Sequence, residues 1–259
     1  MCSSDLLEDA VAPDAKPVAR EQAAEAVRSG AYGAKELTIR CNGLDTPWGA
    51  DDLAVAAAAG PSAVVIPKVS GPQALAEVAR RLEAAGAPDH TRIWAMVETP
   101  EALFNVRQIA GFERVAMLVM GTNDLAKELR AQQVPGRAPL LPHLAMALLA
   151  AREAGKAIVD GVYNDVRDAE GFLSEARQGF EMGFDGKTLI HPGQVDPTNA
   201  LWAPDDEAIA YAGRVIEAFD AAMAEGRGVV TVDGRMIENL HVDNARRTLA
   251  VAAAIAALG

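Results

Sequence analysis

IWAMVETP (residues 93–100) decides the fold, because an apolar, strand-like run ends abruptly at a carboxylate and a helix start. The same pattern recurs along the chain, in LLEDAV (6–11), LTIRCNG (37–43), VVIPKV (64–69), VAMLVMGTND (115–124) and GKTLIHP (186–192). Ala-rich stretches with helical spacing lie between these runs. Strands that alternate with helices predict a parallel sheet, and polar groups at the carboxyl ends of its strands are where α/β barrels carry out their chemistry.

The number of strand-like runs is one short of a closed barrel. We predict seven strands, near 5–11, 35–41, 63–69, 92–98, 115–121, 157–162 and 186–191, whereas a (β/α)8 barrel has eight. The helices between them are predicted near 16–29, 49–59, 72–85, 100–109, 139–154 and 168–182, with a loop over 124–138. The expected fold is therefore a TIM-type (β/α)8 barrel over residues 1–200 that lacks its first β/α unit.

Residues 201–259 are predicted to form a C-terminal extension. It has helices near 204–224 and 239–257, with the extended segment GVVTVDGRMI (228–237) between them. Five apolar residues of this extension, Val229, Val230, Met236, Ile237 and Leu240, favour a partner surface and therefore a homo-oligomer.

Composition excludes several classes of function. The chain carries 24 Lys and Arg against 36 Asp and Glu, a net charge of −12, which argues against nonspecific nucleic-acid binding. An anionic small substrate remains possible, because a few local cations set the potential of a site. The two cysteines have no metal-binding spacing, and no apolar run approaches the roughly 18 residues of a membrane span. With no visible secretory signal, these features predict a cytoplasmic enzyme without membrane partners.

Two carboxylates follow neighbouring predicted strands. Glu98 ends IWAMVE, and Asp124 lies in the turn GTND after the next strand. If the strands are adjacent and parallel, both side chains converge at one rim, where two carboxylates with waters and substrate oxygens are a usual Mg²⁺ site. A rival interpretation is that Glu98 caps the helix that begins near Pro100.

Other strand ends carry further candidates. Arg40 can clamp a carboxylate with two parallel hydrogen bonds, or form a structural ion pair with Glu8 or Asp9. Lys68 can bind a phosphate or a carboxylate, or pair with a nearby acid. His191 is more simply a structural hydrogen-bonding residue than a base.

LEDAV, IRCNG, IPKV, VETPEAL, MGTNDLAKEL, GKTLIHPGQV and DGRMIENLHVDNAR together resemble the citrate lyase beta subunit and malyl-CoA lyase family. These are CoA-ester lyases of the HpcH/HpaI aldolase superfamily. The resemblance covers nearly the whole chain in order. It implies a Mg²⁺ cofactor, a CoA-thioester substrate and reversible cleavage of a 3-hydroxyacyl-CoA into acetyl-CoA and a 2-oxo acid.

The resemblance also implies roles for single residues. Glu98 and Asp124 resemble the metal ligands, and Arg40 resembles the arginine that grips the oxo-acid. Glu8 and Asp9 resemble the acidic pair that supports this arginine and the metal's waters. Glu238 stands where much of the family has an Asp that acts as the general acid, often supplied by a neighbouring subunit of a trimer or hexamer.

The start of the chain departs from the family pattern. The family has a first strand ending in a loop like FVPG, with nearby basic residues for CoA, and nothing here matches it. We therefore expect a truncated member, with Met1–Ser4 foreign and with Lys16, Arg20 or Lys68 compensating as CoA ligands. A native mass near 27.1 kDa would refute truncation.

Three alternatives to the lyase stay open. The first is a class II aldolase acting on pyruvate and an aldehyde. The second is thioester hydrolysis, in which water intercepts the acyl-CoA. The third is a non-catalytic barrel subunit.

Overall fold

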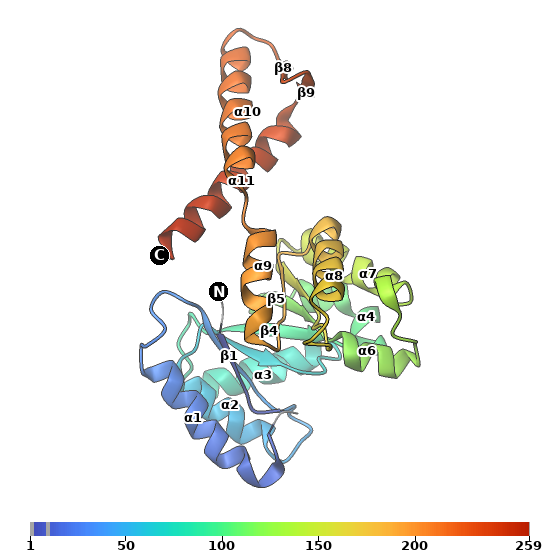
Figure 1. Cartoon of the computed structure of the whole chain (residues 1–259). Coiled ribbons are helices and arrows are strands. Elements are labelled where there is room, and N and C mark those ends of the chain that lie inside the picture. The colour runs from blue at the N-terminus through green and yellow to red at the C-terminus, as the bar shows by residue number, and fades with distance from the viewer. Residues whose placement is uncertain (1–2, 9–10, 259) are drawn as a thin grey trace. The chain divides into compact units, whose positions relative to one another are not determined.

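A computed structural model describes residues 3–8 and 11–258 of the chain (Figure 1). The chain divides into two compact units, Met1–Thr198 and Asn199–Gly259. In the described part of the chain, no helix is long and apolar enough to cross a membrane.

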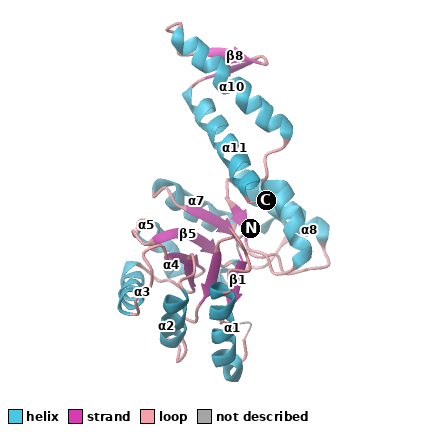
Figure 2. Cartoon of the chain, turned by 90° about the vertical axis from the view of Figure 1, so that its left-hand side faces the viewer, coloured by secondary structure: helices cyan, strands magenta, loops and turns pink. Residues whose placement is uncertain are grey.

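The first unit is built on a curled sheet of seven parallel strands, which pair in chain order without any crossing (Figure 2). The strands are β1 (Ser3–Leu6), β2 (Leu37–Arg40), β3 (Ala63–Ile66), β4 (Arg92–Val97), β5 (Val115–Met120), β6 (Ala157–Asp160) and β7 (Gly186–Lys187). Because every pair is parallel, all carboxyl ends lie at one edge of the sheet. The seven predicted strands and their parallel arrangement are confirmed.

Helices connect successive strands along the outside of the sheet, as Figure 2 shows for α1, α2 and α3. Their bounds are α1 (Lys16–Arg28), α2 (Gly49–Ala59), α3 (Pro72–Ala84), α4 (Pro100–Phe104), α5 (Val106–Ala110), α6 (Thr122–Leu129), α7 (Leu141–Glu153) and α8 (Ala169–Met182). Helix α9 (Val195–Trp202) follows β7, the last strand of the sheet. Short 3-10 turns occupy Pro13–Ala15, Pro135–Arg137 and Pro192–Gln194. The loop predicted over 124–138 is wrong in its first half, because α6 occupies it.

The two faces of the sheet bury different side chains. Alternate strand residues such as Val64, Ile93 and Leu118 pack with the helices in the main core. The intervening positions form a separate cluster of Val65, Met96 and Val119, with Trp94 and Val159 against it. This second face is the inner face of the curled sheet. By the same alternation Arg40 and Glu98, at the ends of β2 and β4, belong to the inner face.

The second unit is a helical pair with a hairpin between its helices. The elements are α10 (Asp206–Ala224), β8 (Val230–Val232), β9 (Arg235–Ile237) and α11 (Asn239–Ala257). Asp233 and Gly234 both have positive φ, as a two-residue turn between antiparallel strands requires. Phe219, Val232 and Ile237 belong to this unit's own core. Of the apolar residues that predicted a partner surface, Val229, Met236 and Leu240 are exposed.

Candidate functional site

Glu98 lies buried at the carboxyl end of β4, with only 2% of its surface exposed. The backbone N–H of Lys68 donates to its Oε1 at 2.6 Å. Lys68 follows β3 and has a φ of +48°. The helix-capping interpretation of Glu98 is wrong, because Thr99 caps α4 by accepting a hydrogen bond from the Ala102 N–H at 3.1 Å.

The surroundings of Glu98 raise its pKa from 4.5 to about 7. Burial is the largest cause, because it removes water from the charged form. The negative charges of Asp124 and Glu8 raise the pKa further, whereas the Lys68 N–H and the Arg40 charge lower it. A buried carboxylate that is repelled by two other carboxylates is stabilised in its charged form by a bound cation.

Asp124 belongs to the first turn of α6 and is partly exposed. The sequence GTND was predicted to be a turn, but the helix already begins at Thr122. Gly121 joins β5 to this helix, and any side chain there would overlap the Glu98 side chain. The absence of a side chain at Gly121 therefore allows the β5–α6 junction to approach Glu98 closely.

Arg40 and Glu8 form an ion pair beside this carboxylate pair. The Arg40 Nε lies 3.2 Å from Glu8 Oε2, and both side chains are mostly buried. The Nε–H is not aligned for a hydrogen bond, so the contact is an attraction of charges rather than a directed bond. The Arg40 side chain is 21% exposed, so it is not sealed off from solvent. Asp9, predicted to share this role, lies outside the described residues.

Lys16 and Arg20, which were predicted to contact CoA, form bonds within the chain, and their contact with CoA stays a prediction. The Lys16 ammonium donates to Leu7 O at 2.8 Å, Glu8 O at 3.0 Å and Asn42 Oδ1 at 2.8 Å, which uses all three of its protons. The Arg20 Nε donates to the fully buried Asp52 at 2.7 Å. These bonds tie the segments that follow β1 and β2 to helices α1 and α2.

Asn42 completes this arrangement. Its backbone N–H and side-chain amide donate to Asp52 Oδ2 at 2.9 and 2.5 Å, and the same amide donates to Leu7 O at 2.8 Å. The polar network therefore fixes the chain directly after Arg40 and directly before Glu8. The Lys68 side chain is exposed, and its predicted contact with CoA stays a prediction.

Glu238 belongs to the second unit, where it caps the N-terminus of α11. Its side chain accepts from the backbone N–H of His241, and the His241 Nδ1 accepts from the Glu238 N–H at 3.0 Å. Its predicted role as general acid stays a prediction. His191 has the structural role predicted for it, because its Nδ1 accepts from the Gly193 N–H at 3.0 Å.

The carboxylates at the inner rim suit a magnesium ion. Among the described residues, no group of three or more His, Cys, Asp and Glu could hold a metal. Mg²⁺ does not need one, because it is usually held by one or two carboxylates and completes its shell with waters and substrate oxygens. Glu98, buried and with a raised pKa, and Asp124, which contributes to that shift, are the residues that would hold it.

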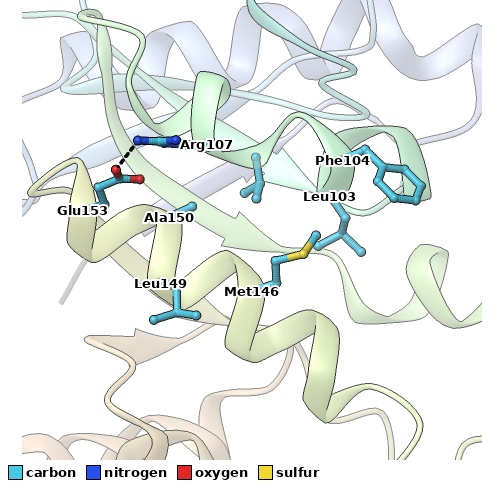
Figure 3. A pocket seen from close by; sticks show the side chains of 8 residues that line it. Leu103, Phe104, Arg107, Met146, Leu149, Ala150 and Glu153 are labelled. Carbon is cyan, nitrogen blue, oxygen red and sulfur yellow. Dashed lines mark hydrogen bonds and ion pairs between the residues drawn. The ribbon is translucent and has the colours of Figure 1, made fainter.

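A separate apolar hollow of about 290 Å³ lies between α4, α5 and α7 (Figure 3). The ion pair between Arg107 and Glu153, 2.6 Å long, closes one side of it. No residue of the carboxylate pair or of the Arg40 ion pair lines it. Its lining consists of Leu103, Phe104, Val106, Arg107, Met146, Leu149, Ala150 and Glu153.

Comparison with known proteins agrees with this geometry. A (3S)-malyl-CoA thioesterase from Cereibacter sphaeroides (strain KD131 / KCTC 12085) is 48% identical over 97% of this chain and 86% of its own length. The citrate lyase subunit beta of Escherichia coli (strain K12) is 35% identical over 94% of this chain and 82% of its own. The structure of the protein CitE from Mycobacterium tuberculosis, in complex with magnesium, acetoacetate and coenzyme A, matches with a TM-score of 0.75. It is 28% identical and covers 96% of this chain and 89% of that one.

The model of the HpcH/HpaI aldolase/citrate lyase family matches residues 5–192, which include Glu8, Arg40, Glu98 and Asp124. This match extends over most of the first unit, and the two relatives extend through the second as well. The resemblance noted in the sequence is thereby confirmed. The chain belongs to the HpcH/HpaI aldolase/citrate lyase family.

Proposed function

We propose that this chain is a Mg²⁺-dependent enzyme that hydrolyses the thioester of a malyl-CoA-type substrate, the CoA ester of a small 3-hydroxy dicarboxylic acid. The observation that carries the proposal is the buried Glu98, whose pKa responds to Asp124, Glu8 and Arg40 at one rim of the sheet. Identity of 48% over nearly the whole chain to a protein named (3S)-malyl-CoA thioesterase favours this bond and this acid.

The residues of the rim have separate tasks in this proposal. Arg40 binds the free carboxylate of the acyl group through its guanidinium, and the ion pair with Glu8 keeps the guanidinium in place. The Lys68 N–H holds the Glu98 carboxylate in the orientation in which it serves as a ligand. When bound, Mg²⁺ supplies positive charge that polarises substrate oxygens and stabilises negative charge developing on them.

Hydrolysis consumes one water. The water oxygen bonds to the thioester carbonyl carbon, and the carbonyl electrons move onto its oxygen. This electron pair then re-forms the carbonyl bond as the C–S bond breaks. The electron pair of the C–S bond leaves with the sulfur of CoA. The proton lost by water ends on the CoA thiol or in solvent. A positioned donor at the carbonyl oxygen is worth roughly 3–4 kcal/mol of barrier in comparable acyl-transfer sites.

Cleavage of a carbon–carbon bond is the second candidate, favoured by the full-length similarity to citrate lyase beta subunits. Here the substrate hydroxyl loses its proton, the bond between the hydroxyl-bearing carbon and the thioester's α-carbon breaks, and a 2-oxo acid forms. The electron pair stays on the acetyl-CoA fragment as an enolate, which a general acid protonates on carbon. Glu238 remains our proposed acid for that step.

Product analysis distinguishes the two reactions. Purified protein is given malyl-CoA, citryl-CoA or citramalyl-CoA, with Mg²⁺ or with EDTA, and free thiol, acetyl-CoA and 2-oxo acid are followed together. Hydrolysis yields free CoA without 2-oxo acid, whereas cleavage yields acetyl-CoA and 2-oxo acid in equal amounts. We expect EDTA to abolish either activity. Turnover that is unaffected by EDTA would refute the magnesium site.

A matched pair of variants links this activity to the rim. Asp124 and Asp196 both lie in the first turn of a helix, α6 and α9. Asp124→Asn should lower kcat/KM at least about 100-fold, because a neutral amide replaces a charged magnesium ligand. Asp196→Asn should leave it within about twofold. If Asp124→Asn is as active as Asp196→Asn, Asp124 is not a magnesium ligand.

Two further features belong to the same proposal. We infer a TIM-type barrel, because β1 to β7 follow one another in the strand order of that fold, with β1 and β7 at the two ends of the sheet.

We also infer a homo-oligomer, a trimer or hexamer, supported by the exposed Val229, Met236 and Leu240. Light scattering on a sizing column tests the oligomeric state. A mass equal to one 27.1 kDa chain would contradict the homo-oligomer.

A further inference from the structure

A buried ion cluster lies at the ends of β6 and β7, among residues that no step above uses. It consists of Arg137, Asp160, Glu175 and Lys187. The Arg137 Nη1 donates to both Asp160 oxygens at 2.8 and 2.9 Å. The Lys187 ammonium donates to Asp160 Oδ2 at 3.2 Å and to Glu175 Oε1 at 2.8 Å. Asp160 and the Lys187 side chain are fully buried.

This ion cluster holds Gly161 through both its backbone N–H and its backbone carbonyl. The Gly161 N–H donates to Asp160 Oδ1 at 2.7 Å, and the Gly161 carbonyl accepts from the Lys187 ammonium at 2.5 Å. Two cations and two carboxylates make the cluster neutral, and the desolvation of buried charges offsets much of their attraction. Its directional bonds therefore define a position more than they add stability.

Gly161 in turn lies against the first turn of α6. A Cβ added at Gly161 would overlap the Thr122 side chain, so the two segments are in direct contact. Three residues further on, Asn164 forms a reciprocal amide pair with Asn123 of the same turn. The Asn123 Nδ2 donates to Asn164 Oδ1 at 3.0 Å, and the Asn164 Nδ2 donates to Asn123 Oδ1 at 2.7 Å. Residues 161–164 thus contact both residues that precede Asp124.

We propose that the ion cluster, acting through residues 161–164, positions the first turn of α6 and thereby places Asp124 for magnesium binding. Asp160, Lys187 and Gly161 are positioning residues, since none of them is a ligand itself. This inference rests on the proposed function, because it assumes that Asp124 is a ligand. Mg²⁺ demands near-ideal octahedral geometry, so a small displacement of the first turn of α6 is expected to weaken binding.

A double-mutant cycle tests the contact between Gly161 and Thr122, with the dissociation constant of Mg²⁺ measured by calorimetry. Gly161→Ala should weaken Mg²⁺ binding at least about tenfold, because the new methyl group pushes Thr122 and the turn away. Thr122→Gly removes the obstruction, so the double variant should bind Mg²⁺ within about threefold of Thr122→Gly alone. Gly213→Ala, where an added methyl group meets open space, is the matched control and should bind as the wild type does.

The outcomes separate this inference from the proposed function. If the wild type binds no Mg²⁺, the proposed function fails and the inference fails with it. If the wild type binds Mg²⁺ and Gly161→Ala binds it equally well, or if Thr122→Gly gives no rescue, only the positioning role is overturned.

A second variant covers the case in which Gly161→Ala does not fold. Asn164 is exposed, so Asn164→Ala should fold as the wild type does and lose only the amide pair with Asn123. We expect it to weaken Mg²⁺ binding about threefold or more without a change of melting temperature in EDTA. An unchanged dissociation constant would then overturn the proposal.

Discussion

Glu98 should couple the proposed magnesium site to pH, because burial and neighbouring charges raise the pKa of its carboxyl group to about 7. A metal ligand must be deprotonated, so Mg²⁺ binding below this pH displaces a proton. We predict that Mg²⁺ affinity rises with pH up to about 7 and is then constant, with binding at pH 6 about tenfold weaker than the plateau. Calorimetry between pH 5.5 and 8.5 measures this. An affinity independent of pH over that range would contradict Glu98 as a ligand.

The same residue is predicted to cost the metal-free protein stability. Its folded-state pKa lies above the value of 4.5 for an unperturbed Glu, so the protonated form favours folding. This contribution is complete below about pH 4.5 and is lost as pH rises through about 7. The loss is at most about 3–4 kcal/mol, because the pKa rises from 4.5 to about 7 and a difference of one in pKa corresponds to 1.36 kcal/mol.

Glu98→Gln removes the charge and keeps an oxygen that can accept the Lys68 N–H. In EDTA at pH 8 we expect this variant to unfold at higher denaturant than the wild type, with a smaller difference at pH 5. Added Mg²⁺ should stabilise the wild type and not the variant. A variant less stable than the wild type at pH 8 would show that the carboxylate is not strained in the metal-free protein.

The position and the bonding partner of each side chain explain which site residues could be predicted from the sequence. Glu98 and Arg40 follow strand-like runs, and the alternation of a strand assigns both to its inner face. Lys16 bonds to the carbonyls of Leu7 and Glu8, and such main-chain partners leave no pattern in the sequence. For the same reason the backbone N–H of Lys68 was not foreseen as the group that contacts Glu98.

At the level of elements, the strands were predicted more reliably than the helices that follow their carboxyl ends. Apolar runs of this length are compatible with a buried strand or a buried helix segment, and their regular alternation with longer helical patterns identifies them as parallel strands. Helix α6 was missed because Gly-Thr-Asn-Asp is typical of a turn, although Asn and Asp also favour the first turn of a helix. Helix α9 was missed because Pro192 and Gly193 precede it and Pro197 lies within it, although proline fits a first helical turn.

The junction between β5 and α6 depends on the missing side chain of Gly121. Gly121→Ala places a methyl group against the Glu98 side chain, so either the junction or Glu98 must move. We expect a loss of about 1–3 kcal/mol in the free energy of unfolding, as is usual for overpacked sites. Mg²⁺ affinity should fall at least about tenfold, because this junction contacts Glu98 and leads directly into the helical turn that carries Asp124. Normal Mg²⁺ binding would show that the close approach is not needed for the site.

Among the described residues, the buried apolar clusters of the first unit share no residue with the core of the second unit. The main core contains Leu53, Leu75 and Ile109, while the core of the second unit contains Val215 and Phe219. All proposed metal ligands come from the first unit, residues 1–198. A ligand stabilises only the part of a protein whose folding creates its site. Magnesium alone should therefore protect the two units unequally.

Hydrogen exchange measured by mass spectrometry tests this. At a Mg²⁺ concentration 100 times its dissociation constant, we expect up to about 2.7 kcal/mol of added protection in the strands and helices of the first unit, with the largest effect near β4, β5 and α6. Peptides from α10 and α11 should exchange at the same rate with and without Mg²⁺. Glu98→Gln is the control, since it should lose the protection in the first unit. Equal protection of both units in the wild type would mean that the two cores unfold together, because only a shared unfolding transition would transfer the free energy of metal binding to α10 and α11.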